Sequence, residues 1–414
     1  MTLRALDRDL SALRIASYSH DTVGLGHTRR SIAVASSMIS SWPDADAMLI
    51  TGNPEATSLP LPPRTDVVTL PTLTKDDDGH YQSRTLSAPL PQVLQMRAAV
   101  VEAAVTSFEP DLLIVDKVPL GVGSELLPTL RRLRSEFDTK IVLGLREILD
   151  DPVTAVAEWT RNRTGQAIAE FYDAVWIYGD RSVYDPVVEY GLPPEVAERC
   201  VFTGYLGADR FTGAQGASAV TPTPSGPYVL CTVGGGQDGE QLARTFAETP
   251  PPAGHTGLVV CGPFMDTDAR TAVHEAAADT RGVAVLDFVP DLHRLIAGAS
   301  AVVSMAGYNS VCEVMVTDRP ALLVPRTRPR AEQLVRARRL VELGVADLLP
   351  LDDLTSDGLR AWCARAVRAP AAAGAARSDV DVDGLRRIPT IAADLLSRRV
   401  AGHATFRGVG HRAA

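Results

Sequence analysis

Two histidines flank a glycine-containing turn near the start of the chain. His20 and His27 lie in the segment SHDTVGLGHTRRS, where Gly24 and Gly26 permit a tight turn of the backbone. A neutral imidazole can accept a proton from a hydroxyl group near pH 7, and Asp21 is close enough in sequence to orient either ring. Because His27 opens the helix after the turn, it is our first candidate for a general base and His20 the second. A purely structural hydrogen bond within the turn remains the alternative for each ring.

A second glycine loop consists of Gly234, Gly235 and Gly236, directly after the apolar run 228–233. Three consecutive glycines let the backbone approach another molecule closely. Such a loop suits a phosphate or a sugar, although a flexible connection between a strand and a helix has the same composition.

The segment SMAGYNSVCEVM, residues 304–315, is predicted to join a strand to a helix. A helix N-terminus presents free N–H groups and partial positive charge, so the start at 307–310 suits a diphosphate. Glu313, one turn later, can bind two ribose hydroxyls because a carboxylate accepts two hydrogen bonds side by side. The structural alternative is a capping box formed by Ser310 and Glu313.

A further helix is predicted to begin in the segment RTRPRAEQL, residues 326–334. Glu332 and Gln333, at its start, are placed to reach sugar hydroxyls. The arginines at positions 326, 328 and 330 either neutralise phosphate or form a solvated basic edge, and we keep Arg330 as a secondary candidate.

The elements that must position these residues alternate between short apolar strands and helices. The strands predicted in the first half are 13–18, 47–51, 66–70, 111–116, 140–145, 174–178 and 200–203, and the helices are 28–41, 91–108, 124–135 and 153–172. Runs such as LLIV and IVLGL are continuously apolar, as expected for parallel strands covered on both faces. The alternation predicts a doubly wound α/β sheet.

A second series of the same kind follows a linker rich in glycine, proline, serine and threonine. Its predicted strands are 228–233, 257–261, 283–288, 301–304, 321–324 and 345–348. We therefore predict an N-terminal extension (1–12), a first domain (13–207), a linker (208–227), a second domain (228–385), and a C-terminal helix with a mobile tail (386–414). Ligands bind open α/β sheets at the carboxyl ends of their strands, so the two domains are expected to face each other across a cleft.

Composition excludes several classes of protein. The 414 residues are 45% hydrophobic and 22% charged, which is ordinary for a globular protein. With 41 basic and 50 acidic residues the net charge is -9, which disfavours nucleic acid as a partner. The five cysteines form no CxxC pair, so neither a metal site nor a disulfide framework is expected. We expect a cytoplasmic protein without a transmembrane segment, for which peripheral membrane contact stays open.

Taken together, these segments resemble the donor-binding region of GT-B glycosyltransferases, and in particular the MurG-like enzymes with a family 28 C-terminal domain. The shared stretches are SHDTVGLGH, IVDKVPLG, LGLREILDDP, FTGYL, TVGGGQDGE, CGPFM, SMAGYNSVCEVM and VPRTRPRAEQL. Two departures stand out: the first loop reads GLGH where the MurG form is richer in glycine, and RTRPR replaces a histidine-containing segment.

The resemblance implies an inverting, metal-independent glycosyltransferase with the GT-B fold and no cofactor. The first domain would bind a hydroxyl-bearing acceptor, which could be a natural product, a polysaccharide or a lipid-linked molecule. The second would bind the nucleotide-sugar, with a UDP-sugar favoured. His27 falls where the family carries its base, Glu313 where it binds ribose, Gln333 where it binds the sugar, and Phe288 in the segment that contacts the nucleobase.

The resemblance sorts the candidates into two groups. The donor-binding group is Gly234, Gly235, Gly236, Phe288, Ser304, Gly307, Tyr308, Asn309, Ser310, Glu313, Arg330, Glu332 and Gln333. The acceptor-side group is Gly24, Gly26, Asp116, Lys117 and Arg146, of which the last three follow strands directly. An internal salt bridge is an equal alternative for Asp116, Lys117 and Arg146.

Two other functions stay open. A nucleotide-sugar 2-epimerase shares the two-domain architecture but would act without an acceptor. A noncatalytic nucleotide-sugar-binding protein would bind nucleotide without turnover, and replacing His27 would not change its behaviour.

Overall fold

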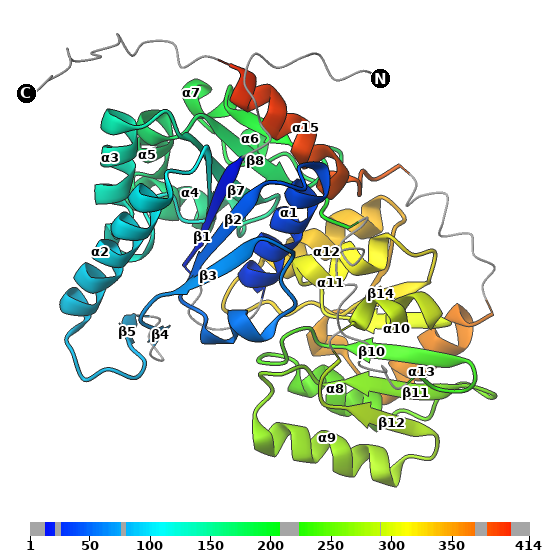
Figure 1. The fold of residues 1–414 in the computed structure, drawn as a ribbon. Coiled ribbons are helices and arrows are strands. Elements are labelled where there is room, and N and C mark those ends of the chain that lie inside the picture. Colours follow the sequence, from blue (N-terminus) through cyan, green and yellow to red (C-terminus); the bar gives the residue numbers. More distant parts are fainter. Residues whose placement is uncertain are drawn as a thin grey trace, which may run out of the picture.

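Two parallel sheets, each covered by helices on both faces, form the molecule (Figure 1). The computed structural model describes residues 13–20, 26–75, 80–207, 223–289, 291–368 and 379–398. Two of the predicted site residues, Asp21 and Gly24, lie outside these ranges, as do the N-terminal extension and most of the linker. The predicted doubly wound α/β architecture is confirmed.

The N-terminal domain is built on a seven-stranded sheet with the order β3-β2-β1-β6-β7-β8-β9. Every pairing in this sheet is parallel, so all its strands end at one edge. Its strands are β1 (Arg14–Ser19), β2 (Asp46–Thr51), β3 (Thr65–Thr69), β6 (Leu112–Asp116), β7 (Lys140–Arg146), β8 (Ala174–Tyr178) and β9 (Cys200–Phe202). Its helices are α1 (Gly26–Ser41), α2 (Leu90–Phe108), α3 (Leu127–Glu136), α4 (Pro152–Arg161), α5 (Thr164–Phe171), α6 (Pro186–Glu189) and α7 (Pro194–Ala197).

The C-terminal domain has a six-stranded parallel sheet with the order β12-β11-β10-β13-β14-β15. Its strands are β10 (Tyr228–Thr232), β11 (Thr256–Val260), β12 (Val283–Leu286), β13 (Ala301–Ser304), β14 (Ala321–Leu323) and β15 (Asp347–Leu348). Its helices are α8 (Glu240–Ala247), α9 (Thr267–Asp279), α10 (Leu292–Gly298), α11 (Tyr308–Met315), α12 (Glu332–Glu342) and α13 (Ser356–Ala366).

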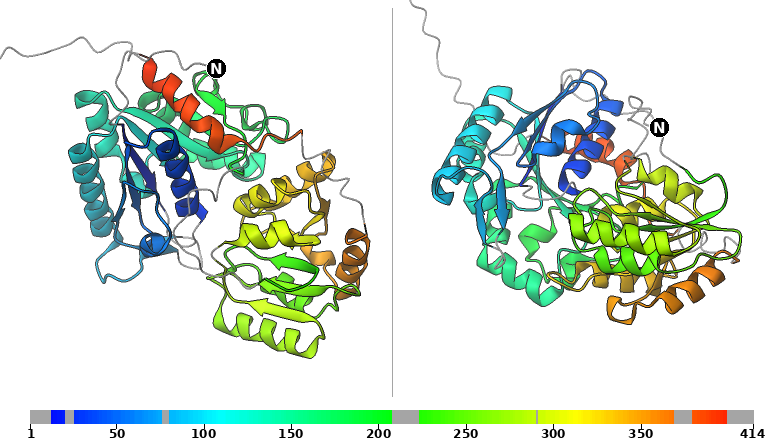
Figure 2. Two further views of the ribbon diagram at one scale, coloured as in Figure 1. Left: turned by 45° about the vertical axis from the view of Figure 1, so that its right-hand side comes forward. Right: turned by 90° about the horizontal axis from the view of Figure 1, so that it is seen from below.

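The last helix, α15 (Gly384–Ser397), returns to the first domain. It lies against α1, although the chain enters it from the C-terminal domain (Figure 2, left). The backbone holds this return in place, because Leu206 forms a bridge with Asp383 and the N–H of Gly384 donates to the carbonyl of Tyr205 at 3.0 Å. The C-terminal segment therefore ties the two domains together, and the helix begins two residues before the boundary predicted from sequence.

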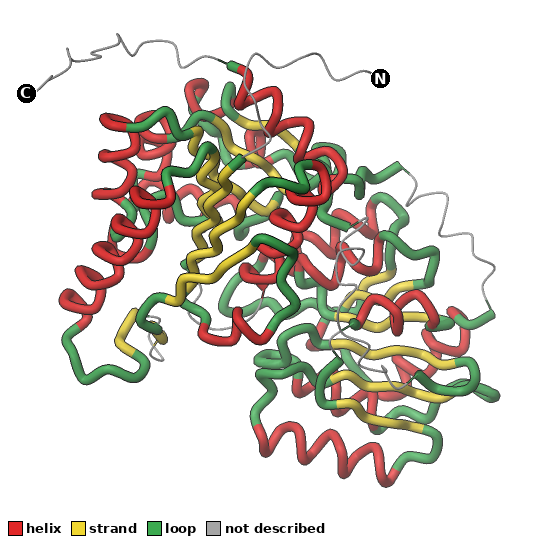
Figure 3. The backbone as a smooth tube through the Cα atoms, in the orientation of Figure 1, coloured by secondary structure: helices red, strands yellow, loops and turns green. Residues whose placement is uncertain are grey.

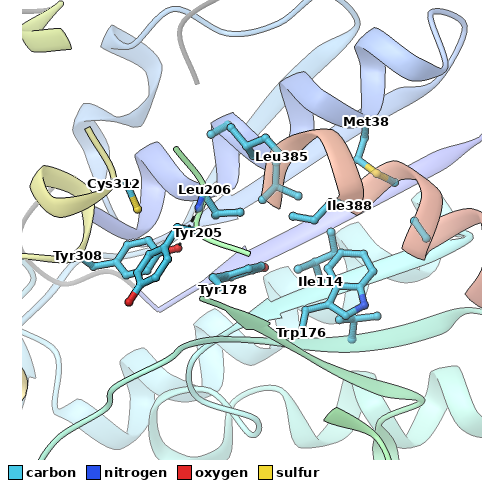
Figure 4. Packing of buried hydrophobic residues seen from close by; sticks show 14 of the residues in the cluster. Met38, Ile114, Trp176, Tyr178, Tyr205, Leu206, Tyr308, Cys312, Leu385 and Ile388 are labelled. Atoms are coloured by element: carbon cyan, nitrogen blue, oxygen red, sulfur yellow. Dashed lines mark hydrogen bonds between the residues drawn. The ribbon is translucent and has the colours of Figure 1, made fainter. Parts of the chain in front are cut away.

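One apolar core crosses the domain boundary. It contains Trp176 of β8, Met38 of α1, Ile388 of α15, and Tyr308 of α11 in the other domain (Figure 4). Tyr205 and Tyr308 stack with their ring centroids 5.9 Å apart, and the Tyr308 hydroxyl accepts the N–H of Leu206 at 3.3 Å. Burial of this shared apolar surface stabilises one relative placement of the domains.

The structure differs from the prediction at one predicted helix and at one hairpin that was not predicted; Figure 3 shows the helices and strands as they are. The helix predicted over 153–172 is two helices, α4 and α5, because Arg163 adopts a left-handed conformation with φ 50° between them. An antiparallel hairpin of β4 (Leu73–Lys75) and β5 (Tyr81–Ser83) was not predicted, since strands of three residues are too short to give a clear alternation.

Candidate active site between the two domains

A cavity lies where the carboxyl ends of the two sheets face each other. Helix α1 and strand β7 of the first domain line one side, and the loops after β10, β13 and β14 of the second domain line the other. The lining residues are Gly26, His27, Arg30, Arg146, Val233, Gly234, Gly235, Gly236, Gln237, Asp238, Met305, Gly307, Tyr308, Asn309, Ser310, Arg326, Glu332 and Gln333. Asn309 joins the two walls, because its side-chain amide donates to the carbonyl of Gly26 at 3.2 Å.

The base candidate His27 contacts a buried carboxylate. Its Nδ1 contacts Oδ2 of Asp116, which ends β6, and Arg30 donates to both carboxylate oxygens at 2.8 and 2.6 Å. Burial alone would raise the pKa of Asp116, but the charges and hydrogen bonds of Arg30 and His27 outweigh burial and hold that pKa well below its usual range. Asp116 is therefore ionised and accepts only.

This geometry selects one tautomer of His27. Arg30 Nη2 also lies 2.9 Å from Nδ1, and a guanidinium only donates, so it competes with the carboxylate for that nitrogen. The carboxylate is charged and closer, so we assign the proton to Nδ1 and the free lone pair to Nε2. The ring is thus prepared to take a proton on Nε2. Arg30 was not among the sequence candidates, although its position three residues after His27 puts both side chains on one helix face.

The structure separates the candidates of the first domain. Asp116 forms the internal salt bridge that was its equal alternative, since its carboxylate pairs with Arg30 and contacts His27. His20 is buried beside His27, with ring centroids 5.0 Å apart, and lines neither cavity described here. Lys117 is half-buried and also lies outside the lining of both cavities, whereas Arg146 lines the first one.

The glycine loop after β10 needs its glycines. Gly234 and Gly236 have φ of 67° and 96°, a region that favours glycine, and a Cβ on Gly236 would lie 2.5 Å from the carbonyl oxygen of Cys261. The loop is therefore folded against the strand end of β11 and is not merely flexible. It borders the N-terminus of α11, where Gly307 is the N-cap and no side chain caps the helix.

The capping-box alternative for Ser310 and Glu313 is wrong. Because Gly307 is the N-cap, both residues lie inside α11, and they line a second cavity. Glu313 is buried and lines that cavity, with Phe264 and Phe288 among the other lining residues. Across the domain boundary, the guanidinium of Arg29 lies 5.9 Å from the ring centroid of Phe288. An aromatic side chain and a carboxylate thus line the same cavity.

The helix start of α12 is only partly as predicted. Glu332 and Gln333 line the first cavity, but Glu332 also pairs with Arg326 at 2.9 Å. Gln333 Oε1 accepts the backbone N–H of Arg326 at 3.2 Å, which leaves the amide NH2 available to a ligand.

Two predicted donor-binding residues have structural roles instead. Arg330 pairs with Asp150 at 3.3 Å and with Glu158 at 2.9 Å, both in the first domain, so it bridges the domains, and it lines neither cavity. Ser304 is buried, donates to the carbonyl of Met305 at 2.9 Å, and lines neither cavity. Arg330 could not be separated from Arg326 by sequence, since both partners of Arg330 lie more than 150 residues away.

Two kinds of feature are absent from the described part of the chain. No group of three His, Cys, Asp or Glu side chains is arranged to hold a metal ion there. No helix in the same residues has the length and apolar character needed to cross a membrane.

Comparison with known proteins agrees with this architecture. Residues 229–379 match the glycosyltransferase family 28 C-terminal domain. A relative from Phenylobacterium zucineum is 28% identical over 210 residues, which is 48% of this chain and 57% of that protein. It is named UDP-N-acetylglucosamine–N-acetylmuramyl-(pentapeptide) pyrophosphoryl-undecaprenol N-acetylglucosamine transferase. The chain therefore spans little more than half the length of that curated relative.

Solved structures extend the likeness to the whole fold. MurG of Acinetobacter baumannii is similar with a TM-score of 0.54 and 14% identity, covering 93% of this chain and 99% of that one. A protein of Listeria monocytogenes named as a UDP-N-acetylglucosamine 2-epimerase is similar with a TM-score of 0.61 and 10% identity. The match covers 92% of this chain and 96% of that one.

Two facing Rossmann-like domains with a ligand cavity between them define a protein of the GT-B fold class. The resemblance to MurG-like GT-B glycosyltransferases is confirmed, with the second domain matching the family 28 C-terminal domain.

Proposed function

We propose that this protein is an inverting, metal-independent glycosyltransferase that moves a sugar from a nucleotide-sugar, preferably a UDP-sugar, to a hydroxyl group. One observation carries the proposal: His27, oriented by Asp116, lines the same cavity as the glycine loop after β10 and the uncapped start of α11. A proton acceptor in one domain thus faces an anion-binding surface in the other.

In the proposed reaction the acceptor hydroxyl gives its proton to Nε2 of His27 while its oxygen bonds to the anomeric carbon. The bond from that carbon to the diphosphate breaks at the same time, so a single displacement inverts the anomeric centre. Asp116 stabilises the imidazolium that forms, as the aspartate does in a catalytic triad. The proton later leaves His27 for solvent.

The leaving nucleoside diphosphate gains negative charge, which the protein itself must stabilise. The N–H groups at the start of α11 and of the loop at 234–236 are suited to this task without a metal ion. We place the nucleoside in the second cavity, with Glu313 on the ribose hydroxyls and Phe288 beside the base. Glu332 and Gln333 are then assigned to the sugar.

For the acceptor we propose a chemical class and the domain that binds it. The curated relative is named for an acceptor on pyrophosphoryl-undecaprenol. For this chain we propose a hydroxyl-bearing acceptor that is lipid-linked, a polysaccharide or a natural product, bound by the first domain next to His27.

A nucleotide-sugar 2-epimerase is the second candidate, because the Listeria protein named as one shares the fold. The two functions separate on a simple criterion: an epimerase converts the donor without any acceptor, whereas a transferase needs one for efficient turnover. Product analysis with the donor alone and with an acceptor mixture therefore decides between them.

The primary experiment is a thermal-shift screen of UDP, dTDP, GDP and ADP and their sugar conjugates. A ligand that binds only the folded state raises the midpoint of unfolding. We expect stabilisation by UDP and a UDP-sugar, and acceptor-dependent release of UDP by the wild type but not by His27→Ala. If none of these nucleotides or nucleotide-sugars raised the midpoint of unfolding, the proposal would be overturned. Nucleotide binding with no turnover in any product assay, unchanged by His27→Ala, would identify a binding protein instead.

A further inference from the structure

Two cationic side chains follow neighbouring strands at the edge of the first sheet. Arg146 is the last residue of β7, and Lys117 follows the last residue of β6. The two strand ends are tied together, since the N–H of Lys117 donates to the carbonyl of Gly144 at 2.8 Å. The same end of β6 supplies Asp116, which orients His27. Both cations therefore lie at the sheet edge that carries Asp116, and Arg146 also lines the cavity with His27.

The surrounding arginines already have carboxylate partners. Arg30 pairs with Asp116, Arg326 with Glu332, and Arg336 with Glu147 at 2.6 Å. The fourth, Arg330, pairs with Asp150 and Glu158. Each of these guanidinium groups is thus compensated within the protein.

Arg146 and Lys117 differ from this pattern. Within the ranges that the structure describes, neither takes part in an ion pair, and the buried Nε of Arg146 has no hydrogen-bond partner. Burial and then the charge of Arg30 lower the pKa of Arg146 to about 10, and burial and then the charge of Arg146 lower that of Lys117 to about 7. A cation that is partly removed from water lowers the stability of the folded protein unless an anion pairs with it.

We propose that Arg146 binds an anionic group, a carboxylate or a phosphate, that the acceptor carries close to its reacting hydroxyl, and that Lys117 at the neighbouring strand end adds positive charge to this site. The inference rests on the proposed function and assigns the chemical class of the acceptor. The guanidinium fork of Arg146 matches either group through two parallel hydrogen bonds. Because Arg146 lines the cavity with His27, an anion bound there holds a nearby hydroxyl within reach of the imidazole.

The donor diphosphate is the other anion that could meet these cations. The backbone surface that suits it, the loop at 234–236 and the start of α11, belongs to the second domain, whereas both cations belong to the first. Binding measured with and without UDP distinguishes the two sources directly.

The test uses the full chain saturated with UDP and three probes of similar size: methyl glucoside, methyl glucuronide and glucose 6-phosphate. Affinities are measured by ligand-observed NMR titration. We expect at least one anionic probe to bind about ten-fold or more tightly than methyl glucoside, and the stronger of the two identifies carboxylate or phosphate. Arg146→Gln should abolish the preference, and Lys117→Gln should reduce it. Arg131→Gln, an exposed position on α3, is the matched control and should retain it.

Three results would overturn the inference. The first is equal binding of all three probes by the UDP-saturated wild type, and the second is a preference that survives Arg146→Gln. The third is anion binding that UDP displaces, which would assign the cations to the diphosphate. UDP affinity is measured for the wild type and every variant in parallel. A wild type that does not bind UDP would refute the proposed function. Only results from proteins that bind UDP test the assignment of the acceptor.

Discussion

Nδ1 of His27 contacts the carboxylate of Asp116, a residue 89 positions away that ends the neighbouring strand β6. This pairing orients the imidazole and gives the first domain a defined chemical role. It also explains why the carboxylate carries two partners, since Arg30 keeps it ionised while His27 uses its charge.

Replacing Asp116 by Asn should lower turnover by about 10²–10⁴-fold, because the imidazolium loses its negative partner and the tautomer is no longer fixed. Nucleotide binding should not change, since Asp116 does not line either cavity. Steady-state rates and UDP thermal shifts measure the two effects. Arg30 loses its partner in this variant, so the melting temperature is recorded as well. Full activity in a folded Asp116→Asn protein would contradict the assigned role.

Glu313→Ala should weaken nucleotide binding by about ten-fold or more, because the two ribose hydroxyls lose their hydrogen bonds to the Glu313 carboxylate. The sharpest measurement compares UDP with 2′-deoxy-UDP. The wild type should prefer UDP, and the variant should bind both with similar affinity. Glu275→Ala, at an exposed position on α9, is the control and should keep the preference. A preference that persists without Glu313 would remove it from the ribose site.

The lowered pKa of Lys117 leads us to expect a specific dependence of folding stability on pH. Its pKa is about 7 in the folded state, against 10.5 for the unperturbed side chain. Between these values the unfolded chain binds a proton that the folded chain does not, so this group makes stability rise with pH from about 7 to 10.5. Below pH 7 both states are protonated, and the full cost of holding this half-buried cation is present.

Lys117→Met should therefore be more stable than the wild type at pH 6, and the difference should shrink as the pH approaches 10. Denaturant unfolding at several pH values measures it. Arg131→Met serves as the control for loss of a surface cation. A constant difference across this range would show that Lys117 does not titrate as described.

Arg336 and Glu147 form a fully buried ion pair across the domain boundary, and the Tyr205 hydroxyl donates to the same carboxylate at 3.0 Å. Arg336→Ala leaves that carboxylate buried without its cation, which should cost about 3–5 kcal/mol. Calorimetry should then resolve separate unfolding of the two domains. The double variant Arg336→Met with Glu147→Leu should recover most of the loss. A single cooperative transition of unchanged midpoint in Arg336→Ala would contradict a role in domain coupling.

Sequence periodicity predicted most of the fold because the signals are local. Continuous apolar runs marked buried parallel strands, and the helix after the first loop begins at Gly26, close to its predicted start. Prediction failed where a single residue conformation decides, as at Arg163 between α4 and α5. It also failed for the short hairpin β4–β5, whose alternation is too brief to detect.

The candidate site divides in the same way. The sequence by itself determined the glycine loops, the open helix starts and the histidine next to one of them, because these depend on residue type and spacing within one segment. Only the tertiary structure decided that Asp116 orients His27, that Arg330 bridges the domains, and that Arg146 and Lys117 have no carboxylate partner among the residues that the structure describes. Charge pairing acts through space between distant strand ends and opposite domains, so no local pattern in the chain can fix it.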